Sequence, residues 1–256
     1  MHRDAETAAN PAPHAVAQLR ATRLAASAKP FLARGSGAGR CEGCRLVASH
    51  CICAQRPTLD ANAGVCLIMG DIEALKPSNT GWLVADLVSD TFAYGWSRTA
   101  VDPALLELLS DPQWQPYLVF PGEFADPCRV VTEVASGVAG PARRPLFVLL
   151  DGTWSEARKM FRKSPYLDAL PVLSLHPDAV SKYRLRRSSR DDHFCTSEVA
   201  ALCLALAGET RAAQTLAAYL DVFTEHYLSV KRNLKLDLES EAHQRLRAVS
   251  APPVDL

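Results

Sequence analysis

Four cysteines lie within thirteen consecutive positions of the chain, at Cys41, Cys44, Cys51 and Cys53. A Cys-x2-Cys turn presents two thiolates together, and structural zinc takes four such ligands in a tetrahedron. We expect a cytosolic chain, where disulfides are rare, so the cluster predicts a structural zinc site. His50 is a competing ligand, and the short Cys-x-Cys pair leaves an iron–sulfur cluster open. Reduced thiols on a surface loop are the plainer alternative.

The sequence Asp151-Gly152-Thr153-Trp154 follows a continuous apolar run and precedes a helical pattern. Its carboxylate can take a proton or bind a cation, its glycine allows close backbone approach, and its indole can stack on a flat ligand. A plain strand-to-helix turn, in which Thr153 caps the helix, explains part of this pattern. The tryptophan in the first helical turn favours a ligand site.

Two clusters of cations accompany this turn. Arg158, Lys159, Arg162 and Lys163 lie on the helix that begins at the turn, and a second basic run spans residues 182–190. The whole chain has 28 basic and 28 acidic residues, so these clusters are local features. Cationic patches with interleaved aromatic residues are typical of RNA-binding surfaces. A solvated helix face is the plainer alternative.

The segment from Glu73 to Gly81 is dense in hydrogen-bonding groups and follows an apolar run. A capped helix start explains Asn79 and Thr80, but it explains Glu73 and Lys76 less well. We therefore assign a site role to this segment, with Lys76, Asn79 and Thr80 as RNA contacts.

Short apolar runs and helical patterns alternate along most of the chain. The expected strands are 64–69, 117–120, 145–150 and 172–175, and the expected helices are 82–89, 103–109, 155–163, 197–207 and 211–230. Continuous apolar strands that alternate with helices predict an α/β fold, with a mostly parallel sheet covered by helices on both faces. Ligands bind such sheets at the carboxyl ends of the strands. The residues after positions 120, 150 and 175 should therefore meet in one pocket.

Composition divides the 256-residue chain into four parts. Residues 1–39 are rich in Ala, Pro and Gly, and we expect a disordered tail and linker with a weak helix over 15–28. The metal module should occupy 40–60, the catalytic domain 61–232 and a C-terminal tail 233–256. Apolar residues make up 48% of the chain, which is enough for a core, and no apolar run is long enough to span a membrane. With no secretory signal evident, we expect a soluble, cytoplasmic protein.

These groups occur in an order that resembles the DTW-domain family, over roughly residues 41–230. The matching segments are Cys41-x2-Cys44-x6-Cys51-x-Cys53, Lys76-Pro-Ser-Asn-Thr-Gly81, Leu118-Val-Phe-Pro-Gly122, Asp151-Gly-Thr-Trp154-x3-Arg158-Lys-Met160, Tyr183-Arg-Leu-Arg186 and Cys195-Thr-Ser-Glu198. Most of these segments are weak signals singly, but six of them in order are specific. One departure is Gly70, where the family often has a histidine.

The resemblance implies a tRNA-uridine aminocarboxypropyltransferase. Such an enzyme moves the 3-amino-3-carboxypropyl group of S-adenosylmethionine to N3 of a uridine in tRNA and releases 5′-methylthioadenosine. The resemblance also implies a fold related to the knotted SPOUT enzymes, including a trefoil knot. Two rival functions are a SPOUT-type RNA methyltransferase with the same cosubstrate and a non-catalytic, zinc-containing RNA-binding protein.

The resemblance also implies which residues form the site. Asp151 is expected to be either the catalytic base or the anchor of the methionine ammonium group. The expected cofactor-binding residues are Phe120, Pro121, Gly122, Glu123, Asp151, Gly152, Thr153, Trp154, Tyr183, Leu185, Arg186, Cys195, Thr196 and Glu198. The expected RNA-binding residues are Lys76, Asn79, Thr80, Arg158, Lys159, Arg162, Lys163, Arg184 and Arg187. The expected partners are tRNA and S-adenosylmethionine, without a membrane, and both a monomer and a homodimer fit the sequence.

Overall fold

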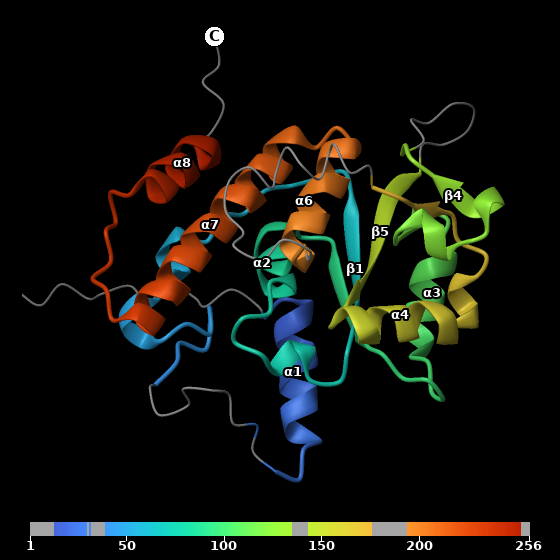
Figure 1. Ribbon diagram of the computed structural model, residues 1–256, viewed down its shortest axis with the longest axis horizontal. Helices are drawn as coiled ribbons and strands as arrows, with labels where there is room; N and C mark the ends of the chain where they lie inside the picture. The colour runs from blue at the N-terminus through green and yellow to red at the C-terminus, as the bar shows by residue number, and fades with distance from the viewer. Residues whose placement is uncertain (1–12, 30, 32–38, 135–142, 176–193, 252–256) are drawn as a thin grey trace, which may run out of the picture.

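Six parallel strands form one sheet at the centre of the protein, in the order β2-β1-β5-β3-β6-β4 (Figure 1). The computed structural model describes residues 13–29, 31, 39–134, 143–175 and 194–251. The strands are β1 (Gly64–Met69), β2 (Thr91–Gly95), β3 (Trp114–Val119), β4 (Val130–Val131), β5 (Arg144–Asp151) and β6 (Val172–Leu173). Each pairing between them is parallel, so the predicted α/β fold with a mostly parallel sheet is confirmed.

Helices cover both faces of this sheet. The described helices are α1 (Ala15–Ala25), α2 (Gly81–Leu87), α3 (Pro103–Ser110), α4 (Trp154–Lys163), α6 (Thr196–Leu206), α7 (Thr210–Arg232) and α8 (Glu241–Ser250). In Figure 1, α2, α6 and α7 lie on one side of the strands, and α3 and α4 lie on the other. Gly208, with a φ of 82°, follows the end of α6 and lets the chain turn into α7.

Strand β1 shows why continuous apolar runs form this sheet. All of its residues are buried. Val65, Leu67 and Met69 belong to the core that includes α2, α6 and α7, whereas Cys66 and Ile68 belong to the core that includes α3 and α4. Successive side chains of a strand point to opposite faces, so a strand covered on both faces must be apolar at every position.

The carboxyl ends of the strands meet at one edge of the sheet. Met69 pairs with Asp151, and Val119 pairs with Leu149 on one side and Leu173 on the other. The backbone N–H of Gly70 donates to the carbonyl of Asp151 at 2.8 Å, so the loop after β1 lies against the Asp151 turn. The strand ends before residues 121 and 151 therefore converge as predicted, whereas the residues that follow position 175 lie outside the described residues.

Two segments that we expected to be tails contain packed helices. Helix α1 buries Val16 in the core that includes α2, and α8 buries Ala242 and Leu246 in the core that includes α7. The helix expected over 15–28 is observed as α1, but it packs against the domain, and the helix α8 within 233–256 was not expected. Their few apolar side chains suffice because the folded domain supplies the other half of each interface.

The two strands at the edges of the sheet were not predicted from the sequence. Strand β2 is only partly buried beyond its first residue, and β4 has two half-buried residues. Neither has a continuous apolar run, because an edge strand is covered less completely than a central one. Pairing with β1 and with β6 makes these segments strands.

A trefoil knot would have to be traced through residues 176–193, which lie outside the described residues, so the knot stays a prediction. Within the described part of the chain, no helix combines the length and the apolar character needed to cross a bilayer.

Candidate functional site

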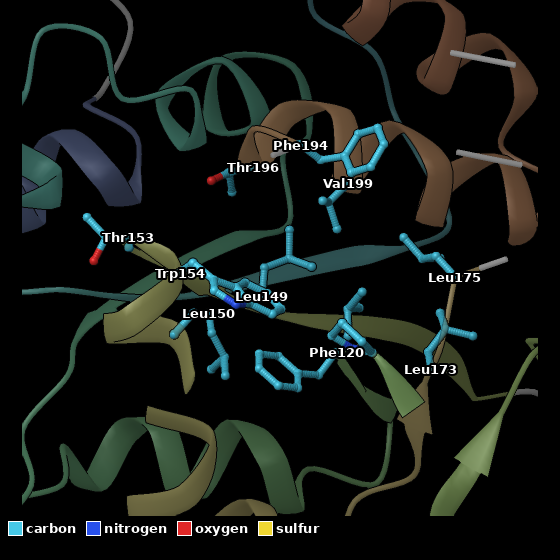
Figure 2. Close-up of a pocket in the computed structure, with 14 residues that line it drawn as sticks. Phe120, Leu149, Leu150, Thr153, Trp154, Leu173, Leu175, Phe194, Thr196 and Val199 are labelled. Atoms are coloured by element: carbon cyan, nitrogen blue, oxygen red, sulfur yellow. The ribbon is translucent and has the colours of Figure 1, made fainter. Parts of the chain in front are cut away.

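A cavity of about 630 Å³ opens at the carboxyl edge of β3, β5 and β6 (Figure 2). Its walls come from these strand ends, from the start of α4 and from the start of α6. The lining residues are Val119, Phe120, Pro121, Leu149, Leu150, Gly152, Thr153, Trp154, Ala157, Leu173, Leu175, Phe194, Thr196 and Val199. Cavities of this size, mainly apolar with a few polar groups, are typical of small-molecule sites.

Stacked aromatic rings form one wall of this cavity. The ring of Phe120 stacks on Trp154, with centroids 5.5 Å apart, and on Phe161 at 4.4 Å. Trp154 keeps 42% of its surface exposed, so its indole is accessible to a ligand. Figure 2 shows Thr196 and Val199 of α6 across the cavity from these rings. The cavity can therefore hold a flat ring between an aromatic wall and an apolar one.

Asp151 ends β5 beside the cavity without lining it. The residue is 5% exposed, and each carboxylate oxygen has a donor. Asn79 Nδ2 donates to Oδ2 at 2.7 Å, and Thr196 Oγ1 donates to Oδ1 at 2.6 Å. Burial raises the pKa of the Asp151 carboxyl, while the hydrogen bonds from Thr196 and Asn79 partly offset this rise. Thr196 also lines the cavity, so this residue lies between the buried carboxylate and the ligand space.

The loop between β1 and α2 holds Asn79 in place. The Asn79 Oδ1 atom accepts from the N–H of Trp82 at 3.2 Å, so Asn79 caps the start of α2 as predicted. A Cβ atom at Gly81 would lie 3.0 Å from Asp151 Oδ2, a tight contact, so glycine favours the close approach of this helix to the carboxylate. The hydroxyl of Thr80 accepts from the first turn of α6 at 3.3 Å. This loop therefore joins α2 and α6 around Asp151.

An ion pair lies next to Asp151. Lys76 Nζ pairs with Glu73 Oε1, and the Glu73 side chain is largely buried. Glu73 raises the pKa of Asp151 and Lys76 lowers it, although both effects are smaller than that of burial. A Cβ atom at Gly70 would stand 3.5 Å from its nearest neighbours, so a side chain could begin there without a clash.

Two capping boxes fix the helix starts that flank the cavity. At α4, Thr153 Oγ1 accepts from the N–H of Glu156 at 3.3 Å, and Glu156 Oε2 accepts from the N–H of Thr153 at 2.8 Å. At α6, the N–H of Cys195 donates to Glu198 Oε2 at 2.8 Å. Cys195 and Glu198, predicted to bind the cofactor, do not line the cavity and stabilise the start of α6 instead.

The structure divides the predicted cofactor-binding residues into three groups. Those that line the cavity are Phe120, Pro121, Gly152, Thr153, Trp154 and Thr196. Those outside the lining are Gly122 and the exposed Glu123 in the turn after β3, together with Asp151, Cys195 and Glu198. Tyr183, Leu185 and Arg186 lie outside the described residues.

Apolar lining residues such as Leu149, Leu173, Phe194 and Val199 were not predicted. An apolar side chain that faces a cavity has the same sequence signal as one that faces a filled core. Only Phe194 had a usable cue, because it directly precedes the Cys195-Thr196 segment.

The residues of the loop after β1 that were predicted to bind RNA differ in how far they are accessible to a nucleic acid. Asn79 is 5% exposed and uses both ends of its amide inside the protein, so its burial does not favour the assignment to RNA, which stays a prediction. Thr80 is half-buried against α6, and Lys76 is paired with Glu73. Arg184 and Arg187 lie outside the described residues.

The basic face of α4 consists of Arg158, Lys159, Arg162 and Lys163, which are all exposed. The Arg158 guanidinium lies 4.8 Å from the centre of the Phe124 ring, whose edge contacts Trp154. The face therefore begins at the aromatic wall of the cavity and continues along the helix away from it.

The four predicted metal ligands converge in one cluster. We call the segment that contains them, residues 40–56, the cysteine module. Their Sγ atoms all lie within 4.8 Å of one another. The Cys41–Cys53, Cys44–Cys51 and Cys41–Cys51 sulfur pairs are 3.5, 3.7 and 3.4 Å apart. A tetrahedron with Zn–S bonds of ~2.3 Å has edges of roughly 3.8 Å, so the donor set fits zinc.

The thiols of this module have unequal pKa values. Burial opposes ionisation of Cys41, but hydrogen bonds from the backbone of Cys44 and from neighbouring thiols outweigh it and lower the pKa of this thiol to about 7. Burial raises the pKa of Cys44 to about 11. A bound divalent cation would stabilise both thiolates, since metal ligation is coupled to thiol deprotonation.

These features together define an α/β protein with a small-molecule cavity at the carboxyl edge of a parallel sheet and a separate four-cysteine centre. The DTW domain family model matches residues 38–228, and the chain belongs to the DTW-domain family.

Among curated proteins, the chain is similar to tRNA-uridine aminocarboxypropyltransferase 2 of Drosophila melanogaster, with 31% identity over 125 residues. The matched region covers 48% of this chain and 46% of that relative, so the chain spans about half the length of the relative. No solved structure matches the chain.

Proposed function

We propose that this protein transfers the 3-amino-3-carboxypropyl group of S-adenosylmethionine to N3 of a uridine in tRNA. Membership of the DTW-domain family and the name of the Drosophila relative support a role in tRNA modification. The observation that carries the proposal is the hydrogen bond between the buried carboxylate of Asp151 and Thr196, a residue that lines the cavity.

The cavity fits S-adenosylmethionine by size and by chemistry. Its volume of about 630 Å³ suits a nucleoside with a short side chain. Phe120 and Trp154 would hold the adenine ring by stacking, and Leu149 and Val199 would exclude water from it. The cosubstrate supplies an electrophilic γ-carbon on a sulfonium and departs as 5′-methylthioadenosine.

In the proposed mechanism the chain supplies positioning and a path for one proton. A bond forms between uridine N3 and the γ-carbon while the carbon–sulfur bond breaks and its electron pair remains on sulfur. The Thr196 hydroxyl passes its proton to Asp151 Oδ1 and takes the N3 proton of the uridine. The raised pKa of the Asp151 carboxyl makes it a better proton acceptor than an exposed aspartate.

The direct test is the reaction of the purified protein with S-adenosylmethionine and unmodified tRNA, followed by mass spectrometry of the nucleosides. We expect 3-(3-amino-3-carboxypropyl)uridine in the tRNA and 5′-methylthioadenosine in solution. The same uridine should lose this modification in cells that lack the protein. Adenosylhomocysteine as the by-product would show methyl transfer instead, and no turnover with intact tRNA binding would favour a non-catalytic protein.

The basic face of α4 should contribute to tRNA affinity. Changing Arg162 and Lys163 to Gln removes two cations, and the slope of log K against log salt should become shallower by about 2. Binding of S-adenosylmethionine should stay unchanged, because both side chains lie at the far end of α4 from the cavity.

Lys231 and Arg232 provide a matched control for this double variant, because they are two exposed cations at the end of another helix, α7. Their change to Gln should leave the salt slope at the wild-type value. If the Arg162 and Lys163 double variant also kept the wild-type salt slope, tRNA would not contact this end of α4.

A further inference from the structure

Arg45 is a buried cation with an unusual backbone conformation. It directly follows Cys44 in the Cys-x2-Cys turn, is 3% exposed and has a φ of 63°. This left-handed conformation is strained for a non-glycine residue. Among the described residues, the other non-glycine with a positive φ is Asn233, which ends α7 in a common C-cap conformation.

The guanidinium of Arg45 reaches the loop that precedes α2. It donates to the carbonyl of Lys76 at 2.6 Å and to the carbonyl of Asn79 at 2.9 Å. It also lies 4.0 Å from the centre of the Trp82 ring. Trp82 in turn donates from Nε1 to the carbonyl of Gly43 at 3.0 Å. The Cys-x2-Cys turn therefore contacts both ends of the segment 76–82.

The same segment holds the carboxylate of Asp151. Asn79 Nδ2 donates to Asp151, and Asn79 Oδ1 is fixed by the N–H of Trp82. Only one residue, Asn79, thus separates the Arg45 guanidinium from the Asp151 carboxylate. A guanidinium suits this position because its planar fork can donate to two carbonyls at once, which a lysine ammonium on a flexible stem does less well.

We propose that Arg45 is a positioning residue through which the metal-loaded cysteine module holds Asn79, and hence Asp151, in place. Cys41 and Cys44 would hold the zinc ion, which would fix the turn between them and Arg45 directly after it. Arg45 holds the carbonyls of Lys76 and Asn79. The part of this inference that concerns Asp151 in the reaction rests on the proposed function. The part that concerns the loop 76–82 does not.

The test is hydrogen–deuterium exchange of peptides that cover residues 76–82, with the full chain loaded with zinc and after chelation. In the wild-type protein, removing zinc should speed exchange in this segment by about 10-fold, which is the effect of losing hydrogen bonds to a charged donor. In Arg45→Ala the segment should already exchange rapidly with zinc bound, and chelation should change it less than about 2-fold.

Arg56→Ala is the matched control. Arg56 also anchors the module, since it donates to the carbonyl of Gly43 at 3.0 Å and pairs with Asp86 at 2.9 Å, and neither of these contacts involves residues 76–79. Its zinc-loaded form should exchange in 76–82 as the wild type does, and its response to chelation should persist. Arg45→Lys, which keeps the charge, should be intermediate and serves if Arg45→Ala does not fold.

The proposal would be overturned if residues 76–82 of the zinc-loaded Arg45 variants exchanged as slowly as in the wild type. It would also be overturned if chelation changed exchange in Arg45→Ala as much as in the wild type.

A second readout is the pH profile of kcat/KM for tRNA modification. Loosening Asn79 weakens a hydrogen bond that lowers the pKa of Asp151, so the acid limb should move to higher pH in Arg45→Ala. If exchange of residues 76–82 changed but the pH profile of kcat/KM did not, the result would support the positioning of the loop by Arg45. It would contradict the role of Asp151 in the reaction.

Discussion

The Asp151→Asn variant should modify tRNA with a kcat/KM about 10²- to 10⁴-fold below that of the wild type, the range by which a positioned proton acceptor accelerates a reaction. An amide cannot take the proton that leaves uridine N3. Single-turnover assays with saturating S-adenosylmethionine would measure the effect on the chemical step. In the wild-type protein, kcat/KM should also fall as the pH drops below the raised pKa of Asp151, because the protonated carboxyl no longer accepts a proton.

The substitution is conservative for the fold. The amide oxygen can accept from Asn79, and the amide NH2 can donate to Thr196 if the Thr196 hydroxyl reverses. The folded-state pKa of Asp151 lies above its unfolded value, so ionisation of this group costs stability as the pH rises between the two values. The Asn variant lacks that cost, and we expect its thermal stability at neutral pH to equal or exceed that of the wild type.

Affinity for S-adenosylmethionine distinguishes the two roles expected for Asp151. A proton acceptor can be lost without a change in affinity, whereas loss of an ammonium anchor should weaken binding by about 10-fold or more. Calorimetry on Asp151→Asn measures this directly. Thr196→Val should reproduce the kinetic loss because it removes the hydroxyl between the carboxylate and the cavity, and Thr196→Ser should retain activity. Near wild-type rates for Asp151→Asn would contradict the proton-acceptor role.

Cys44→Ser should lose the metal and destabilise the protein. Structural zinc sites contribute apparent binding free energies of ~10–16 kcal/mol, which are coupled to the folding of the module. Leu46 and Ile52 of the module are fully buried in the main core, so the module's loss exposes apolar surface. We expect the free energy of unfolding to fall by at least about 3 kcal/mol and the Tm by about 10 °C. Metal analysis and thermal melts measure these two effects.

Cys128→Ser is the control for this variant, because Cys128 is exposed and lies outside the cluster. It should keep the zinc content and the Tm of the wild type. A Cys44→Ser protein with full zinc content would show that the cluster is not the metal site. A coloured wild-type protein whose visible absorption fades on reduction would show an iron–sulfur cluster instead.

Much of the sheet could be predicted because its central strands are buried on both faces. The runs at 64–69 and 145–150 are apolar at every position, and that pattern indicated parallel strands before any contact was known. The edge strands β2 and β4 and the helices α1 and α8 lacked such a pattern. They are stabilised by the surface against which they pack, which is a property of the folded chain and not of their own residues.

The candidate groups for the chemistry of this protein could be read from the sequence. The spacing of four cysteines predicted a metal site, and the position of Asp151 after an apolar run predicted an acidic group at a strand end. What each of these groups contacts became known only from the folded structure. It placed Asn79 and Thr196 on the two oxygens of Asp151, and it placed Arg45 between the cysteine module and that contact. These partners are far apart in sequence, and local spacing carries no information about pairs that meet only when loops from different parts of the chain pack together.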